Sequence, residues 1–213
     1  MQNIKVAVIG CGRISGHHCN SIIDIEGIEM VAVCDIDITK AEEYRDKYGV
    51  KAYCNYHKML KENDIDVVAI VTPSGMHYEH ALDIIENYNK SVIIEKPTFM
   101  LPSQVKDIYL KAKERSLSVF AVFQNRHNKA VQRVLSGIEN DELGKLRTFA
   151  VRVRWGRPQS YYNLAPWRGT FSMDGGCLTN QGIHHIDLMR KLGGEVSKVV
   201  STHNTLGADI EVE

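Results

Sequence analysis

A glycine-rich turn directly after an apolar run constrains the fold of this chain more than any other feature. The run covers Lys5–Ile9, and the turn that follows reads Gly10-Cys11-Gly12-Arg13-Ile14-Ser15-Gly16. Four further β-rich runs lie at residues 30–35, 66–71, 91–95 and 118–123, and stretches with helical spacing, such as 76–87 and 104–115, stand between them. Strands that alternate with helices predict a parallel sheet built from right-handed βαβ units.

The glycine turn predicts a phosphate-binding loop. Gly10 permits the tight turn, Gly12 lets the backbone approach a pyrophosphate, and Ser15 stands where the usual fingerprint has its third glycine. The helix that begins there offers free backbone N–H donors to the phosphates. A tight turn without a ligand is the alternative, and the βαβ context favours a dinucleotide site.

Asp35 ends the second β-rich run, 19 residues after Gly16. A carboxylate at this place accepts hydrogen bonds from both hydroxyls of an adenosine ribose and repels a 2′-phosphate, so it favours NAD over NADP. Asp37 stands close by, but it is equally suited to begin the next helix as its N-cap, and we do not assign it to the cofactor.

The composition is ordinary for a globular protein and argues against two classes of partner. The 213 residues are 44% hydrophobic and 24% charged, and 26 basic residues balance 26 acidic ones. A neutral chain gives no electrostatic reason to expect nucleic acid or an anionic membrane. The longest apolar run, Val67–Val71, is too short to cross a bilayer. Because Lys5–Ile9 follows the first residue so closely, we expect no signal peptide and a cytoplasmic protein.

Five cysteines, at positions 11, 19, 34, 54 and 177, form no Cys-x-x-Cys pair. An odd count without such a pair predicts reduced, mostly buried thiols.

The pattern changes after the run at 118–123, which predicts two domains, residues 1–123 and 124–213. In the second, helical spacing predicts helices at 128–138 and 181–192, and we expect strands at 146–155 and 196–205. The run Leu146–Trp155 alternates apolar and polar residues, as a half-exposed strand does. Gly193-Gly194 is expected to stop the second helix.

Glu95-Lys96-Pro97 ends the run at 91–95, at the carboxyl edge where α/β sheets bind ligands. A lysine there can hydrogen-bond a reacting hydroxyl or relay its proton. Taken alone, Lys96 is better explained as a solvated side chain at the end of a strand. Two histidine pairs, His77-x-x-His80 and His184-His185, invite a metal interpretation. The first has no acidic or thiol partner beside it and the second diverges on a helix, so we expect no metal.

Five motifs stand in one order along the chain. They are the glycine turn, Thr72-Pro73-Ser74-x-x-His77, Glu95-Lys96-Pro97, Trp167-Arg168, and a Gly175-Gly176 segment that leads to His184-His185-Ile186-Asp187. In this order and spacing the chain resembles the Gfo/Idh/MocA family of NAD(P)-dependent oxidoreductases from residue 4 to its end.

The resemblance implies an α/β protein with an N-terminal Rossmann domain, followed by an α+β domain with an open, mostly antiparallel sheet that is incomplete here. It also implies a nicotinamide between Lys96 and His184 and a cis peptide at Lys96–Pro97. The implied NAD-binding residues are Gly10, Gly12, Arg13, Ile14, Asp35, Thr72, Pro73, Ser74, His77, Glu95, Lys96, Gln124, Trp167 and Arg168.

One position departs from the family pattern. Many members carry Asp four residues before the catalytic histidine, where this chain has Asn180. An amide takes no proton, which leaves Lys96 and His184 as the catalytic residues, with His184 suited to act as a general base. His185 points about 100° away on a helix and is interpreted as a structural residue or as one that supports the site residues. Asp187 orients a ring or faces solvent, and both possibilities stay open.

The loop sequences resemble one branch of the family, the UDP-N-acetylglucosaminuronate 3-dehydrogenases of bacterial surface-polysaccharide (O-antigen) synthesis. This implies that His184 removes the proton of the sugar C3 hydroxyl while hydride leaves C3 for NAD, and that Lys96 stabilises the oxygen. The implied substrate-binding residues are Lys96, Arg157, Gln159, Tyr161, Asn180 and His184. Ordinary packing is the alternative for Tyr161.

Two other functions stay open: another sugar or inositol dehydrogenase of the family, and a non-catalytic NAD-binding fragment. Family members continue well beyond residue 213, so we expect a C-terminally shortened chain with an unpaired sheet edge. The homo-oligomer, dimer or tetramer, that the family forms is therefore uncertain for this chain.

Overall fold

The computed structural model describes residues 3–202, 204 and 207–212, and the chain divides into two compact units. The first unit ends at Val122 and the second begins at Phe123, one residue before the boundary that the sequence suggests.

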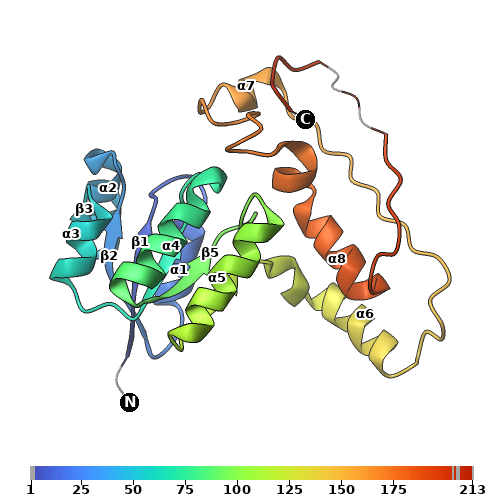
Figure 1. Cartoon of the computed structure of the whole chain (residues 1–213), viewed down its shortest axis with the longest axis horizontal. Helices are drawn as coiled ribbons and strands as arrows, with labels where there is room; N and C mark the ends of the chain where they lie inside the picture. Colours follow the sequence, from blue (N-terminus) through green and yellow to red (C-terminus); the bar gives the residue numbers. More distant parts are fainter. Residues whose placement is uncertain (1–2, 203, 205–206, 213) are drawn as a thin grey trace. The chain divides into compact units, whose positions relative to one another are not determined.

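The first unit is built on a six-stranded parallel sheet (Figure 1). Its strands are β1 (Ile4–Ile9), β2 (Ile28–Cys34), β3 (Lys51–Tyr53), β4 (Val67–Ile70), β5 (Ser91–Ile94) and β6 (Val119–Ala121). Their order across the sheet is β3-β2-β1-β4-β5-β6, and every neighbouring pair is parallel. The winding therefore reverses between β1 and β4, the place where an open α/β sheet has its ligand crevice.

Helices cover both faces of this sheet. They are α1 (Ser15–Ile23), α2 (Ile38–Tyr48), α3 (Tyr56–Glu62), α4 (His77–Tyr88) and α5 (Pro102–Glu114), with a 3-10 turn η1 (Ser74–Met76) before α4. Helices α1 and α2 supply one apolar core with Val6 and Val8 of β1, and α3 to α5 supply the other with Ala7 and Ile9. Successive side chains of a strand point to opposite faces, so a sheet buried on both faces requires continuous apolar runs.

The β-rich runs of the sequence correspond to β1, β2, β4, β5 and β6, so these predictions are confirmed. Strand β3 escapes prediction because its three residues are too few to show a period. The alternative interpretation of Asp37 is also confirmed: its side chain caps α2 by accepting from the Thr39 backbone N–H at 3.1 Å. Within the described ranges, no helix has the length and apolar character that crossing a membrane requires.

The cysteines are free thiols, as the sequence predicts. Cys11, Cys19 and Cys34 are buried, whereas Cys54 and Cys177 are exposed. Burial raises the pKa of the Cys11 and Cys34 thiols to about 12 and that of Cys19 to about 11, so these three stay protonated at neutral pH.

The second unit consists of helices joined by long irregular segments. They are the 3-10 turn η2 (Gln124–His127), α6 (Lys129–Glu139), α7 (Gln159–Tyr162), the π-helical turn η3 (Cys177–Gln181) and α8 (Ile183–Gly193). The helices expected at 128–138 and 181–192 are confirmed as α6 and α8, and Gly194 ends α8 with a φ of 90°.

The prediction of two strands in the second unit is wrong for the residues that the structure describes. Residues 146–155 and 196–202 form no strand, and positions 203 and 205 lie outside the described residues. A strand needs a neighbouring strand to which it is hydrogen-bonded, and in the described part of this unit neither segment has such a neighbour. The apolar side chains of the first segment, Phe149, Val151, Val153 and Trp155, stay 38–57% exposed. The mostly antiparallel sheet is thus missing from the described part of this unit.

Candidate active site

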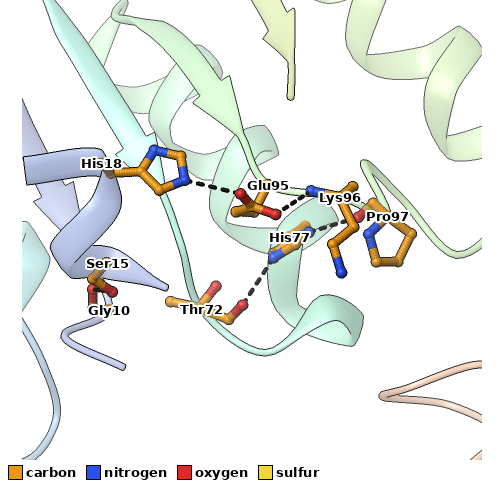
Figure 2. A network of polar contacts seen from close by, with 8 residues as sticks. All are labelled: Gly10, Ser15, His18, Thr72, His77, Glu95, Lys96 and Pro97. Carbon is orange, nitrogen blue, oxygen red and sulfur yellow. Dashed lines mark hydrogen bonds and ion pairs between the residues drawn. The ribbon is translucent and has the colours of Figure 1, made fainter. Parts of the chain in front are cut away.

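Gly10 occupies a backbone position that other residues cannot adopt without strain. Its φ is 97°, and a Cβ atom there would lie 2.6 Å from the carbonyl oxygen of Val71, just beyond β4. The Gly10 backbone N–H donates to Cys34 O at 2.7 Å, and the Ser15 hydroxyl donates to Gly10 O at 2.6 Å, which closes the turn. Figure 2 shows Ser15 next to Gly10. The end of β1 is therefore held against its two neighbouring strands.

The space beside Gly12 fits a pyrophosphate. A Cβ atom at Gly12 would meet no described atom within 4 Å, and Arg13 and Ile14 are exposed next to it. Ile14 is the N-cap of α1, and its apolar side chain offers no acceptor to the first backbone N–H groups of the helix. Such a helix start binds phosphates well.

Asp35 is aimed at this space by two backbone hydrogen bonds. Its Oδ2 accepts from the Cys11 N–H at 2.8 Å, and its Oδ1 accepts from the Asp37 N–H at 2.9 Å. A carboxylate oxygen accepts more than one hydrogen bond, so both oxygens can also accept from ribose hydroxyls. Gly10, Gly12, Ser15 and Asp35 thus form a site that fits NAD.

His77 joins the loops that follow β4 and β5. It is 1% exposed, and its Nδ1 and Nε2 lie 2.8 Å from Pro97 O and 2.9 Å from Thr72 O (Figure 2). Burial lowers the pKa of His77, although the two carbonyls oppose that shift. Pro73 and the buried Ser74 lie between Thr72 and His77 in the sequence. The contact of His77 with Thr72 therefore holds this expected cofactor loop in place.

His77 is not placed as a metal ligand. Both ring nitrogens of His77 face carbonyl oxygens, so neither is directed at an ion. Among the residues that the structure describes, no group of three or more His, Cys, Asp or Glu side chains is arranged to hold a metal.

The Lys96–Pro97 peptide is cis, which confirms the prediction. Glu95, which precedes it, is buried, with its Oε1 2.9 Å from His18 Nε2 and its Oε2 accepting from the Lys96 backbone N–H at 2.9 Å. Burial alone raises the pKa of Glu95, but the hydrogen bonds and charges of His18 and Lys96 together outweigh it and hold this pKa below its ordinary value. His18 is a site residue that the sequence analysis missed.

In the second unit, Asn180 is buried against Asp174. The Asn180 side-chain amide donates to Asp174 Oδ1, and the Gly169 backbone N–H donates to Asp174 Oδ2 at 2.9 Å. Asp174 was not predicted as a site residue. Its only sequence signal is its place directly before Gly175-Gly176.

Tyr161 is the centre of a cationic and aromatic cluster. Its hydroxyl accepts from Arg168 at 2.5 Å and from Gln181 at 2.8 Å, and Gln181 accepts from Arg157 at 2.9 Å. The Arg157 guanidinium lies 4.0 Å from the Trp155 ring centroid, and that of Arg168 lies 4.7 Å from the ring centroid of Trp167. This arrangement holds the two guanidinium groups against aromatic rings.

Gln159 does not join this cluster. It pairs with Asn163 at 3.1 Å and lines an open cavity of about 420 Å³ together with Tyr162 and Asp209. Gln124 is exposed at the start of η2.

Asp187 pairs with an arginine, which is neither of the two possibilities left open for it. It accepts two hydrogen bonds from Arg126, one of them from Nε at 2.7 Å, and this contact raises the pKa of Arg126. Arg126 also lies 5.3 Å from the ring centroid of Phe123, and the Phe123 ring meets the His184 ring edge-on at 6.2 Å. The turn η2 therefore supports the face of α8 that carries His184.

Two family models match the chain. "Oxidoreductase family, NAD-binding Rossmann fold" covers residues 4–123, and "GFO/IDH/MocA C-terminal domain" covers residues 131–213. The chain belongs to the Gfo/Idh/MocA family. Among curated members, the D-glucoside 3-dehydrogenase of Escherichia coli is 30% identical over 94% of this chain and 57% of its own length.

Two solved structures of this family are highly similar. They are the WlbA dehydrogenases of Chromobacterium violaceum and Bordetella pertussis, both in complex with NADH and UDP-GlcNAcA. Both have a TM-score of 0.95 and cover 100% of this chain, at 33% and 32% identity. This chain covers 62% and 65% of their length, so it spans less than two thirds of the relatives that it matches.

Proposed function

We propose that this protein takes part in the NAD-dependent oxidation of the C3 hydroxyl of a UDP-N-acetyl-hexosaminuronate to a 3-keto sugar. The observation that carries this proposal is the likeness to the two WlbA dehydrogenases, which hold NADH and UDP-GlcNAcA. A role in O-antigen synthesis, a cytoplasmic location and assembly into an oligomer stay predictions.

The residues of the first unit have distinct roles in this proposal. When bound, NAD supplies the hydride acceptor. Asp35 holds the adenosine ribose, and its carboxylate repels a 2′-phosphate. Gly12 and the start of α1 hold the phosphates of the dinucleotide. The Lys96 ammonium stabilises negative charge on the reacting oxygen.

The residues of the second unit act on the sugar nucleotide. His184 removes the hydroxyl proton as a general base. Asn180, which is held by Asp174, hydrogen-bonds the sugar. Its amide cannot relay a proton, so its role is to orient the substrate. Arg157 and Arg168 pair with the carboxylate or diphosphate of the substrate.

A second candidate is the oxidation of a simple sugar or glycoside. It is favoured by the 30% identity with the D-glucoside 3-dehydrogenase and predicts no dependence on UDP.

A thermal-shift panel with NADH, NADPH, UDP, UDP-GlcNAcA, a methyl glucoside and myo-inositol tests both candidates. A ligand that binds only the native state raises the unfolding midpoint by mass action. Shifts with NADH and UDP-GlcNAcA, and weaker ones with NADPH and the free sugars, support the proposal. A shift with the glucoside but none with either UDP compound favours the second candidate. A shift with NADH alone favours a non-catalytic NAD-binding fragment.

A further inference from the structure

A short chain of hydrogen bonds connects α1 to the backbone of Lys96 inside the first unit (Figure 2). His18 lies in the first turn of α1, the helix whose start faces the phosphate space. Its Nε2 is 2.9 Å from Glu95 Oε1, and Glu95 Oε2 accepts the Lys96 N–H at 2.9 Å. One carboxylate therefore contacts both the phosphate-binding helix and the backbone of the expected catalytic lysine.

The surroundings of this carboxylate leave it few other partners. The side chains of His18 and Glu95 are 14% and 8% exposed, so water replaces a lost contact poorly. Three charged or titratable groups face Glu95: His18 from α1, His77 from α4, and Lys96, which follows β5. Of these, His18 supplies the side-chain hydrogen bond, while both ring nitrogens of His77 are engaged by backbone carbonyls.

We propose that His18 is a positioning residue for Lys96. It holds the Glu95 carboxylate in one orientation, and Glu95 holds the backbone segment from which the Lys96 ammonium reaches the reacting hydroxyl. This inference rests on the proposed function, because it assumes that Lys96 acts on the substrate oxygen. Misplacing a catalytic group by about 1 Å reduces turnover on the order of a hundredfold, so the effect is measurable.

Three variants separate this role from simple packing. His18→Leu removes the hydrogen bond to Glu95. His18→Gln keeps an N–H donor and is the conservative variant that should restore function. His17→Gln, at an exposed neighbouring position on the same helix, is the matched control.

The first measurement needs no bound ligand and no turnover. The carbon-13 carboxyl resonance of Glu95, assigned by its absence in Glu95→Gln, and the amide resonance of Lys96 are followed against pH. We expect both to report one midpoint in the wild type, because the amide donates to that carboxylate. In His18→Leu this midpoint should rise, because the buried anion loses both the hydrogen-bond donor and the charge of His18. In His18→Gln it should rise less, because the N–H donor stays and only the charge is lost, and in His17→Gln it should stay near the wild-type value.

The second measurement compares turnover with cofactor binding, using NAD and UDP-GlcNAcA for turnover and NADH for affinity. His18→Leu should lower kcat by about tenfold or more while the Kd for NADH changes by less than about twofold. His18→Gln should recover most of the turnover. The acid limb of the pH profile of kcat should move to higher pH in His18→Leu, in step with the carboxyl midpoint.

Two results overturn the inference: an unchanged Glu95 midpoint in His18→Leu, or equal losses of NADH affinity and turnover, as a merely structural role predicts. If the wild type shows no turnover at all, the proposed function fails. In that case, a shift of the pH midpoint of the Lys96 amide resonance in His18→Leu still supports the positioning of the backbone by His18. A midpoint that is the same in His18→Leu and in the wild type refutes it.

Discussion

At the scale of single residues, Gly10 and Gly12 share a loop but meet different physical requirements of this structure. Gly10 has no room for a Cβ atom and a φ of 97°, whereas Gly12 borders open space. We expect Gly10→Ala to lower the free energy of unfolding by about 2–4 kcal/mol, through backbone strain and overpacking against Val71. Urea denaturation checks this value.

Gly12→Ala is the matched control for that variant. It should leave the free energy of unfolding nearly unchanged, while NADH affinity falls, because the new methyl group enters the space next to the phosphates. If Gly10→Ala and Gly12→Ala lowered the free energy of unfolding equally, the two glycines would not have the different structural roles inferred here.

Asn180→Asp would place a second carboxylate against Asp174 in a buried site. Two such groups cannot both ionise cheaply, so one pKa is held above its ordinary value in the folded state. The variant should therefore be less stable than the wild type at pH 7, and the difference should shrink as the pH falls toward about 4, where the unfolded chain also binds the proton. Urea denaturation across this pH range measures it.

The exchanged pair provides the control. Asp174→Asn combined with Asn180→Asp restores one amide and one carboxylate, and it should regain most of the lost stability at pH 7. A double variant as unstable as Asn180→Asp alone would show that the defect does not come from paired charges.

His184→Asn removes the proposed general base and keeps a polar side chain. Turnover should fall by about 10²–10⁴-fold, and the Kd for NADH should stay within a small factor of the wild type. His185→Asn, its neighbour on α8, should keep most of the turnover. Loss of NADH binding in His184→Asn would refute the assignment.

At the scale of elements, the contact between Arg126 and Asp187 connects η2 to α8. A double-mutant cycle with Arg126→Met and Asp187→Leu should give a coupling of about 1 kcal/mol, because Asp187 is mostly shielded while Arg126 remains partly solvated. The pair Arg190 and Glu195, also on or next to α8 but far more exposed, should show a coupling near zero. Equal couplings would argue against a special role of η2 in supporting α8.

The elements that the sequence predicts best are those whose own residues determine them. The apolar runs of β1, β2 and β4 and the cap at Asp37 depend on neighbours along the chain, so periodicity and residue type suffice. The segment Leu146–Trp155 has the alternation of a strand, but a ladder depends on a partner that local pattern cannot supply. The π-helical turn at Cys177–Gln181 has no local signature that distinguishes it from an ordinary helical turn.

The candidate site divides in the same way. The glycine loop and Asp35 carry their chemistry in their spacing and were predictable. The partnership of His18 with Glu95 spans 77 residues, and Asp174 owes its role to burial beside Asn180. Neither contact has a sequence period, so only the folded structure reveals them.

At the scale of the whole molecule, the two units should differ in resistance to proteolysis. Arg147, Arg152 and Arg154 lie exposed in an irregular segment of the second unit, whereas the sheet of the first unit is buried on both faces. Limited trypsin digestion should cut first at these three arginines and release a fragment that retains the first unit. Mass spectrometry identifies the cuts, and early cleavage within β1 to β5 would contradict the expectation.

The contacts that shape the dinucleotide loop each join two residues of the first unit, as Ser15 does with Gly10, Asp35 with Cys11 and His77 with Pro97. In evolutionary terms, such a loop tolerates sequence drift in residues 123–212. A lineage can then change its second unit without rebuilding the part that carries the NAD-binding fold.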